Sequence, residues 1–492
     1  MSLAHRGQFI AAAMLAAGFA LSGLATNANA QSRPSVNVSP SVAKLQADVP
    51  ALMKQADVPG VSMAIVRNGK IAWHGNFGVK NAKTGEPVDD NTVFEAASLS
   101  KPVFAYAVLK LVEQGKMGLD VPLTTYLAKP YIADDRLKEI TARFVLSHRT
   151  GFPNWRGEGN PLTIHFTPGE RFSYSGEGFV YLQRAVEQIA GQPLDEVMKT
   201  LVFTPLGMAS SSYVWRPDFD QSTATGHDSD RTPQNLWKPT EAGAASTLNT
   251  TARDYALFVA AVANGVGLKR STFREMETPE VAVNPECTNC TEKAPKELSK
   301  TIFWGLGWGI EKTGHVSSLW HWGDNGSFKC FVVANPARRS GAVLFTNSEN
   351  GLAIAPAVMR DATGALPLAF TWLKYDAYDS AAMKFRQAVR DQGAERAMEL
   401  FATQLKDGTI PEGTVNNVGY HVLWREHAIE AIRIFRLNTQ IHPQSSNAFD
   451  SLGEGYMVSG DKTQAIENYE KSLALDPGNS NAAAQLKKLR GK

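Results

Sequence analysis

Alternating apolar and polar residues predict a β-hairpin near the beginning of the chain. The segment GVSMAIVRNGKIAWHGNFGV alternates on both sides of Asn68-Gly69, a dipeptide typical of two-residue hairpin turns. Residues 41–56, which precede the hairpin, have the pattern of a helix. After the hairpin a helix is predicted from about Ser98 to Gly115, because its apolar residues recur on one face: Phe104, Val108, Leu111 and Val112.

Farther along, helical patterns give way to strand patterns. A block over roughly 120–250 is helix-rich and includes GFVYLQRAVEQIAG and TARDYALFVAAVANG. Strand patterns return in the segments FWGLGWGIE, SSLWHWG, FKCFVVANP and GAVLFTNS, and a helix follows near 352–363. This order predicts one α/β sheet domain over 42–370 that is interrupted by a helical insertion at about 120–250.

The region 380–492 has a different, repetitive pattern. Four residues recur 34 positions later, in the pairs Gly419/Gly453, Ala431/Ala465, Phe435/Tyr469 and Pro443/Pro477. The second copy, at about 446–479, resembles a tetratricopeptide repeat, while the first, at about 412–445, is degraded in its opening helix. Two readings stay open: a stabilising appendix, or a groove that docks a protein partner.

The first thirty residues predict an export signal. A polar start is followed by the apolar run FIAAAMLAAGFALSGLA and by Ala28-Asn29-Ala30, a small-x-small cleavage site. We expect cleavage after Ala30, a linker over 31–41, and a secreted or periplasmic mature protein without a membrane span. An uncleaved N-terminal anchor is the alternative.

Composition narrows the class of protein. With 492 residues, of which 43% are hydrophobic and 20% charged, the chain can bury a large core and form more than one domain. The formal net charge of +2 and the lack of long charged runs give no indication of a nucleic-acid partner.

The three cysteines fit an oxidising compartment. Cys287 and Cys290 lie in a polar loop, where a small disulfide is expected; half of a zinc site is the alternative, although no second ligand pair stands nearby. Cys330 alternates with apolar neighbours and is predicted to be a buried strand thiol.

Ser-x-x-Lys occurs three times, and the placement of each copy decides its value. Ser41 to Lys44 and Ser459 to Lys462 lie at the mature N-terminus and between two repeat helices, whereas Ser98 to Lys101 begins the long apolar helix. A spacing of three puts Lys101 on the face of Ser98, beside unpaired N–H groups of the helix start. A desolvated lysine there can act as a base; a helix cap beside a solvated lysine is the alternative.

Two further segments bear chemistry. Tyr174 follows a turn and precedes a helix, and a neighbouring lysine ammonium is expected to favour its phenolate. His321-Trp322-Gly323 ends a strand, and the turn that follows begins at Asp324, whose N–H can face an oxyanion. The triplets at 83–85 and 312–314, both Lys-Thr-Gly, are predicted to be turns without a catalytic role.

Serine, lysine, tyrosine and a basic-x-Gly strand, in this order, resemble the penicillin-recognising serine hydrolases. The resemblance is strongest to the class C β-lactamase-like family, which includes D-aminopeptidases, carboxylesterases and D,D-peptidases, and it covers about residues 42–365. FVLSHRTGFP and TPGERFSYSG are similar to connecting segments of that family. The resemblance implies an antiparallel sheet flanked by helices, with an inserted all-helical subdomain.

The resemblance also implies a role for each matched residue. Ser98 would be the acylated nucleophile, Lys101 its proton acceptor and Tyr174 the acid/base toward the leaving group. His321 would replace the lysine of the usual Lys-Thr-Gly, and the backbone N–H groups of Ser98 and Asp324 would form the oxyanion hole. No metal or organic cofactor is implied.

Two departures from the family pattern concern substrate recognition, which the resemblance assigns to Gly176 and Gly323. Gly176 stands where the family usually has the Asn of Tyr-x-Asn, so a side-chain amide is missing; Glu177 could fill the space or simply begin the helix. His321 can be uncharged at neutral pH and would then hold a substrate carboxylate weakly. Both changes favour a broad esterase or peptidase over an efficient β-lactamase.

The sequence therefore predicts an exported serine hydrolase that acts on a small ester, amide or D-amino-acid peptide. A true β-lactamase or D,D-carboxypeptidase is the nearest alternative. A non-catalytic ligand-binding protein that docks partners through its repeats is the alternative from another class.

Overall fold

The computed structural model describes residues 42–157, 159–314 and 316–491. The predicted signal peptide and linker, residues 1–30 and 31–41, lie outside the described residues. The chain divides into two units, one ending at Tyr375 and the other beginning at Asp376. Within the described residues, no helix is long and apolar enough to cross a membrane.

The first unit is built on an antiparallel eight-stranded sheet in the order β2-β1-β10-β9-β8-β7-β6-β5. Its strands are β1 (Gly60–Arg67), β2 (Lys70–Gly78), β5 (Val281–Ala282), β6 (Ile302–Trp304), β7 (Gly309–Thr313), β8 (Val316–Asp324), β9 (Lys329–Asn335) and β10 (Ser340–Thr346). The predicted hairpin is confirmed: Asn68 and Gly69 join β1 to β2 with φ of 51° and 71°, the positive values that a type I′ turn requires. The segment 303–311, predicted as one strand, forms β6, a turn and β7.

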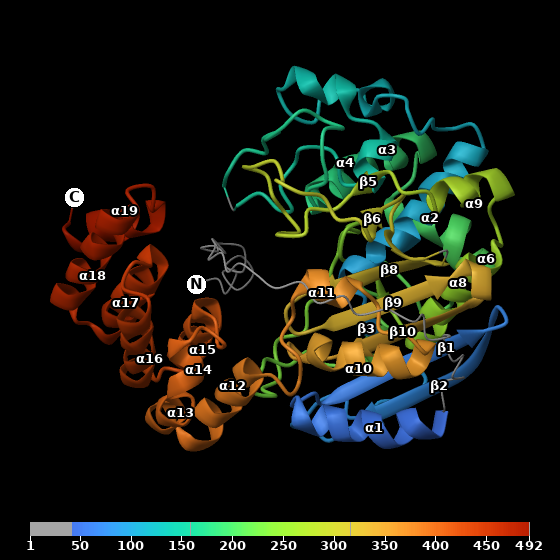
Figure 1. The fold of residues 1–492 in the computed structure, drawn as a ribbon. Helices are drawn as coiled ribbons and strands as arrows, with labels where there is room; N and C mark the ends of the chain where they lie inside the picture. Colours follow the sequence, from blue (N-terminus) through green and yellow to red (C-terminus); the bar gives the residue numbers. More distant parts are fainter. Residues whose placement is uncertain (1–41, 158, 315, 492) are drawn as a thin grey trace, which may run out of the picture. The chain divides into compact units, whose positions relative to one another are not determined.

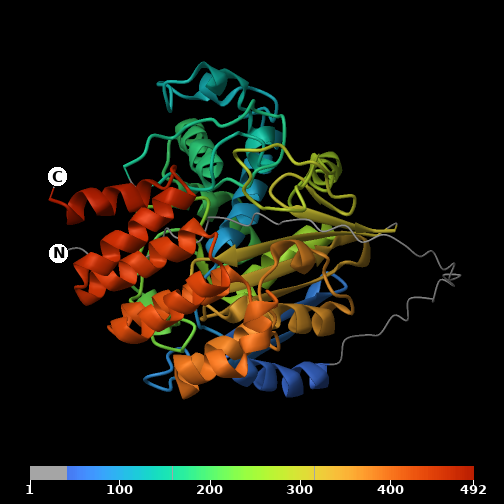
Figure 2. The same cartoon turned by 60° about the vertical axis from the view of Figure 1, so that its left-hand side comes forward.

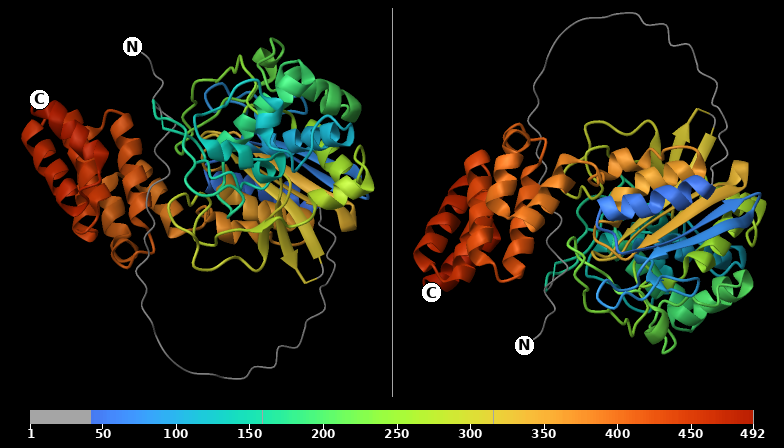
Figure 3. Two further views of the ribbon diagram at one scale, coloured as in Figure 1. Left: turned by 90° about the horizontal axis from the view of Figure 1, so that it is seen from above. Right: turned by 90° about the horizontal axis from the view of Figure 1, so that it is seen from below.

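Helices cover both faces of the sheet (Figure 1). On one face α1 (Val42–Gln55) and α10 (Gly351–Thr363) lie side by side, as Figure 3 also shows. On the other face lie α2 (Ser100–Glu113) and α8 (Ala252–Asn264). Successive side chains of each strand point to opposite faces of the sheet and so pack against one or the other helix layer. The predicted class, an antiparallel sheet flanked by helices, is confirmed.

The middle block is less helical than its pattern predicts. It contains η2 (Leu123–Tyr126), η3 (Asp135–Glu139), α3 (Ala142–Leu146), α4 (Gly176–Ala190), α5 (Leu194–Met198), η4 (Lys199–Phe203), α6 (Thr204–Leu206) and α7 (Phe219–Ser222). The described parts of 147–175 and 223–248 have no helix, because Gly, Pro and polar residues interrupt the apolar period. The helix predicted at 251–265 is α8, which lies on the sheet and not in the insertion.

The remaining elements of the first unit are short. A separate pair of strands, β3 (Phe94–Glu95) and β4 (Asn249–Thr250), places the segment before Ser98 next to the segment before α8. The other helices are η1 (Ala97–Leu99), α9 (Arg270–Met276), η5 (Pro336–Arg338) and α11 (Ala369–Leu373).

The second unit is entirely helical in its described part, and Figure 2 shows its helices stacked side by side. They are α12 (Ala381–Gln392), α13 (Ala394–Leu400), α14 (Ala402–Lys406), α15 (Glu412–Trp424), α16 (Ala428–Ile441), α17 (Ser446–Ser459), α18 (Lys462–Leu475) and α19 (Ser480–Leu489). The contacts repeat with the 34-residue period: a Cβ on Gly419 would lie 2.4 Å from the Phe435 ring, and one on Gly453 3.1 Å from the Tyr469 ring. The tetratricopeptide assignment and its protein partner stay predictions.

Phe435 is the buried centre of the first helix pair, with 0% of its surface exposed. Replacing it with Ala should cost the helical unit about 3 kcal/mol of unfolding free energy, because a cavity replaces the ring between α15 and α17. Urea denaturation followed by far-UV circular dichroism measures this loss. Ile429→Ala, on the same helix but 73% exposed, is the control and should shift the curve by less than about 0.5 kcal/mol; equal shifts would contradict the packing described.

Candidate active site

Ser98 lies in the tight turn that leads into α2. It belongs to η1, and α2 begins two residues later at Ser100. The preceding residue, Ala97, has φ of 46°, in the left-handed region that costs a non-glycine residue about 1–3 kcal/mol. Ser98 is partly exposed, and among the described residues nothing accepts a hydrogen bond from its N–H. The strained turn therefore presents both the hydroxyl and a free N–H.

Lys101 contacts Ser98 from inside the protein. Its Nζ lies 2.9 Å from Ser98 Oγ and donates to the carbonyl oxygen of Ala245 at 2.8 Å. The side chain has 0% of its surface exposed, so the alternative of a solvated lysine is wrong. Burial lowers the pKa of Lys101 to about 7, because the ammonium loses its hydration without gaining a counter-ion. A large fraction of the amine is therefore neutral near pH 7 and can accept a proton.

Tyr174 completes the group, with its ring centre 4.8 Å from Lys101 Nζ. Its hydroxyl is buried and has no hydrogen bond of standard geometry within the described residues. Burial raises the pKa of the phenol, and the nearby Ser98 hydroxyl offsets only part of that rise. The expectation that Lys101 favours the phenolate is wrong, because Lys101 lies against the ring and is itself partly neutral. Tyr174 is protonated and suited to donate a proton.

His321 projects from β8 into the same cluster. Its Nδ1 lies 2.7 Å from the carbonyl oxygen of Trp322, which can only accept, so the hydrogen is on Nδ1 and Nε2 is left as a buried acceptor. Burial, assisted by the nearby Lys101, lowers the pKa of His321 to about 3. The imidazole is neutral, as anticipated, and offers no charge to a substrate carboxylate.

The structure adds a residue that the sequence reasoning missed, His148. Its ring stacks on Tyr174 with centres 4.2 Å apart, and its Nδ1 accepts the Ser175 N–H at 3.0 Å. It is completely buried, and burial lowers its pKa well below the usual value. His148 thus supports both the ring of Tyr174 and the backbone beside it. The sequence offered one signal for it, because His148 lies in FVLSHRTGFP, a segment similar to a connecting segment of the family, but no role was assigned to the histidine.

Aromatic side chains exclude water from this group. Trp322 lies 4.7 Å from Tyr174 and Trp304 lies 5.4 Å from His321, measured between ring centres, while Phe179 lies 5.7 Å from Lys101 Nζ. Such an environment has a low dielectric constant, so charges are penalised and dipoles act strongly. The enclosure is the physical cause of the three lowered pKa values, those of Lys101, His148 and His321.

Gly323 lets β8 approach the turn that holds Ser98. A Cβ at this position would lie 2.3 Å from Cys330 Sγ, 2.7 Å from the carbonyl oxygen of Ala96 and 3.1 Å from the Ala97 Cβ. The place of a side chain on Gly323 faces the turn and the next strand, and the substrate contact predicted for this glycine stays a prediction. Its role is close packing.

Asp324 and Gly176 occupy the positions next to the two motifs. The Asp324 carboxylate accepts the Tyr375 hydroxyl at 2.7 Å and forms an ion pair with Lys329, so its side chain is committed to the structure. Gly176 is the first residue of α4, and Ser175 caps that helix by accepting the Gly178 N–H at 2.9 Å. The binding of an oxyanion by the Asp324 N–H stays a prediction.

The cysteine loop braces the tyrosine. Cys287 and Cys290 are joined in a disulfide, and between them the carbonyl oxygen of Thr288 accepts the Tyr174 N–H at 2.9 Å. Cys330 is free and buried, as predicted. In residues 42–157, 159–314 and 316–491, no group of three or more His, Cys, Asp or Glu side chains is arranged to hold a metal ion.

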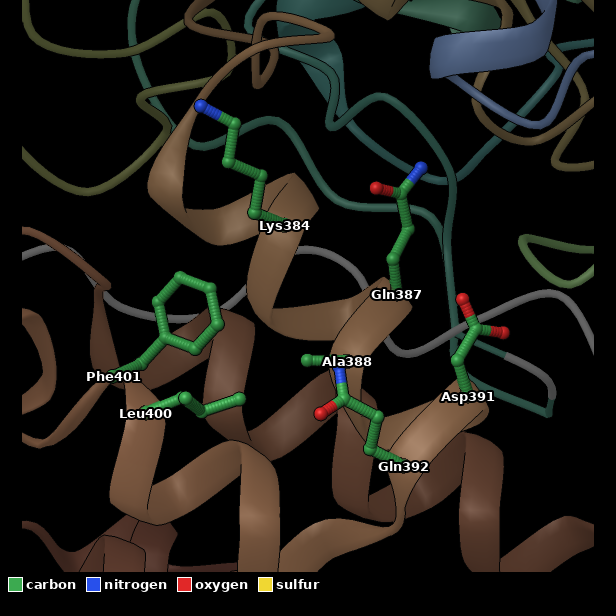
Figure 4. A pocket seen from close by; sticks show the side chains of 7 residues that line it. All are labelled: Lys384, Gln387, Ala388, Asp391, Gln392, Leu400 and Phe401. Carbon is green, nitrogen blue, oxygen red and sulfur yellow. The ribbon is translucent and has the colours of Figure 1, made fainter.

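The competing motifs lie elsewhere. Lys83 of the first Lys-Thr-Gly triplet is exposed in a turn, as predicted. Lys312 and Thr313 of the second triplet are exposed but belong to β7, so the prediction of a turn is wrong for them and holds only for Gly314. Ser459 and Lys462 lie at the end of α17 and the start of α18. An open pocket in the helical unit (Figure 4) contains none of the predicted site residues. It is lined by Lys384, Gln387, Ala388, Asp391, Gln392, Leu400 and Phe401.

Gly323→Val tests the close approach of β8 to the Ser98 turn. We expect a loss of about 1–3 kcal/mol in unfolding free energy, seen as a lower melting temperature, because a side chain must displace backbone atoms. Gly413→Ala is the control, since a Cβ there meets nothing within 4 Å. A Gly323→Val protein with the same melting temperature as the wild type would contradict the close packing.

Comparisons with known proteins identify relatives of this chain. Esterase EstB of Burkholderia gladioli is 28% identical over 210 residues, 37% of this chain, and the match spans only 53% of the esterase. Penicillin-binding protein 4* of Bacillus subtilis is 24% identical over 391 residues, which cover 71% of this chain and 80% of that protein.

Solved structures share the fold. The octameric penicillin-binding protein homologue from Pyrococcus abyssi matches with a TM-score of 0.54 and 21% identity, over 71% of this chain and 81% of that one. D-alanine carboxypeptidase AmpC from Burkholderia cenocepacia matches with a TM-score of 0.54 and 20% identity, over 65% of this chain and 98% of that one. The family model described as Beta-lactamase matches residues 45–362, and the chain therefore belongs to the β-lactamase family of serine hydrolases.

Proposed function

We propose that the protein is an exported serine hydrolase that cleaves a small carboxylic ester or amide through an acyl-enzyme on Ser98. The observation that carries the proposal is the 2.9 Å contact between Ser98 Oγ and the buried Lys101, whose pKa is about 7. A neutral amine at hydrogen-bond distance is what a serine hydroxyl needs in order to become a nucleophile.

In acylation, the neutral Lys101 amine accepts the proton of Ser98 Oγ while Oγ attacks the substrate carbonyl carbon. The oxyanion that forms is stabilised by the N–H groups of Ser98 and Asp324. Tyr174 donates its phenolic proton to the leaving oxygen or nitrogen as the bond to the carbonyl carbon breaks, and it regains a proton from the Lys101 ammonium.

In deacylation, a water molecule attacks the acyl carbon and the proton transfers run in reverse. The water proton passes through Tyr174 and Lys101 to Ser98 Oγ, which leaves as the acid product departs. The enzyme returns to its starting protonation state, and the chemistry requires no redox step or cofactor.

Esters are the favoured substrates over β-lactams and D-alanyl peptides. A neutral His321 gives no positive charge to hold a substrate carboxylate, and Gly176 gives no side-chain amide. The esterase among the relatives supports this preference; the penicillin-binding proteins and the β-lactamase among them favour the alternative.

Ser98→Ala should abolish covalent labelling by a fluorophosphonate probe, because the hydroxyl that is phosphonylated is gone. Intact-protein mass spectrometry of the mature protein before and after labelling measures the adduct. Ser459→Ala is the matched control, since Ser459 belongs to another Ser-x-x-Lys and should leave labelling unchanged. Equal labelling of Ser98→Ala and wild type would refute the nucleophile.

The pH dependence of ester turnover should report Lys101. Below its pKa of about 7 the lysine is protonated and cannot accept the Ser98 proton, so kcat/KM should fall about tenfold per pH unit on the acid side and level off above neutrality. Hydrolysis of p-nitrophenyl acetate, followed at a wavelength independent of pH, gives the profile.

The titration of Glu95 must be distinguished from that of Lys101 in this pH profile. Glu95 is buried near the site, accepts the Asn325 amide at 2.9 Å, and burial raises its pKa to about 7 as well. Glu95→Gln should keep the acid limb if Lys101 is the base. Loss of the limb in Glu95→Gln would assign the titration to the carboxyl and contradict the proposed role of Lys101.

A further inference from the structure

A loop from another part of the chain is fixed against the start of α4, just beyond Tyr174. The carbonyl oxygen of Asn154 accepts the N–H groups of Gly176 and Glu177, each at 3.0 Å, and Asn154 Oδ1 also lies 3.0 Å from the Gly176 nitrogen. Two residues on, Arg156 donates to both oxygens of the Glu177 carboxylate, at 2.9 and 2.7 Å. Both neighbours of Trp155 are thereby anchored to the start of α4, Asn154 to Gly176 and Glu177 and Arg156 to Glu177.

These hydrogen bonds define the role of Glu177. Its side chain is 7% exposed and is paired with the Arg156 guanidinium, so the carboxylate is a structural anchor. The expectation that Glu177 could take the place of a missing amide at position 176 is therefore wrong.

The indole of Trp155 occupies the place that a side chain at 176 would take. A Cβ built on Gly176 would lie 2.6 Å from both Cη2 and Cζ2 of Trp155 and 3.0 Å from the carbonyl oxygen of Asn154. The glycine and the tryptophan are therefore complementary, because any larger residue at 176 requires the indole to move.

Backbone geometry puts this indole on the side of the chain that Tyr174 faces. Ser175 has φ of −139° and ψ of 116°, an extended conformation in which positions 174 and 176 project to the same side. Tyr174 contacts Lys101 from that side. Trp155 is 47% exposed, so its ring can be contacted from solvent on the side of the chain that Tyr174 faces.

We propose that Trp155 is a specificity-determining residue whose indole binds the acyl group of the substrate. This inference rests on the proposed function and narrows it to esters with an aromatic or apolar acyl group. Contact between an aromatic face and an apolar group stabilises the complex, because apolar surface on both is removed from water. A substrate with an acylamino group at this place would bury a polar amide without a partner, which disfavours peptides and penicillins.

A double-mutant cycle on Trp155 and Gly176 tests the inference. For each variant, kcat/KM is measured with p-nitrophenyl phenylacetate and p-nitrophenyl acetate, which share a leaving group, and acylation by a fluorescent penicillin is timed. Trp155→Ala should lower the phenylacetate-to-acetate ratio about tenfold. Gly176→Asn alone should lower the melting temperature and gain no penicillin reactivity, because the indole blocks the new side chain.

The double variant Trp155→Ala, Gly176→Asn should behave in the opposite way to Gly176→Asn alone. In the double variant, Trp155→Ala opens space for the asparagine side chain. At least half of the drop in melting temperature that Gly176→Asn alone causes should therefore be recovered. Acylation by the fluorescent penicillin should be about tenfold faster than in either single variant. Additive effects, with neither recovery nor acceleration, would overturn the complementarity of the two positions.

Controls separate this inference from the proposed function. Trp155→Phe keeps an aromatic ring and should keep most of the ratio, and Trp424→Ala removes another exposed indole and should leave the ratio unchanged. If wild type takes a fluorophosphonate on Ser98 but Trp155→Ala and Trp155→Phe both keep the wild-type ratio, the inference fails and the proposed function stands. If wild type is not labelled on Ser98, the proposed function fails first.

Discussion

The chemistry of the site depends on keeping water away from Lys101. A lysine in water holds its proton far above neutral pH, and here complete burial lowers the pKa to about 7. The cause is desolvation and not a neighbouring cation, so the base strength of the amine is set by the packing of Tyr174 and Phe179 around it. Any opening that admitted water would return the amine to its ordinary pKa and remove the base.

The same dry surroundings decide the charge of both imidazoles. His148 and His321 are buried, each uses Nδ1 in a backbone hydrogen bond, and each is neutral at physiological pH. The group around Ser98 therefore holds proton carriers without a fixed counter-charge for a substrate carboxylate. In the proposed function, the burial that makes Lys101 a base also disfavours charged substrates, so reactivity and specificity share one physical origin.

Much of the fold and part of the site could be predicted from the sequence, and the division has a physical reason. The hairpin at Asn68-Gly69 and the helix behind Ser98 follow from local periodicity and turn chemistry, and Lys101 follows from the helical spacing of three. The carbonyl of Ala245 and the ring of His148 reach the site from loops without a period. The charge of Tyr174 was wrongly predicted because it depends on burial, which no short motif encodes.

The two glycines that end the motifs, Gly176 after Tyr174 and Gly323 after His321, show why a motif alone does not specify recognition. At Gly323 the missing side chain makes room for the Ser98 turn, so the glycine helps to hold the proposed nucleophile in place. At Gly176 the missing side chain makes room for Trp155, which lies 21 residues earlier and is held by the ion pair of Arg156 with Glu177. If Trp155 binds the acyl group as proposed, an indole and not an amide meets the substrate there, and the loop at 154–156 sets that surface. Substrate choice can therefore differ among members of one family while the reacting groups stay the same.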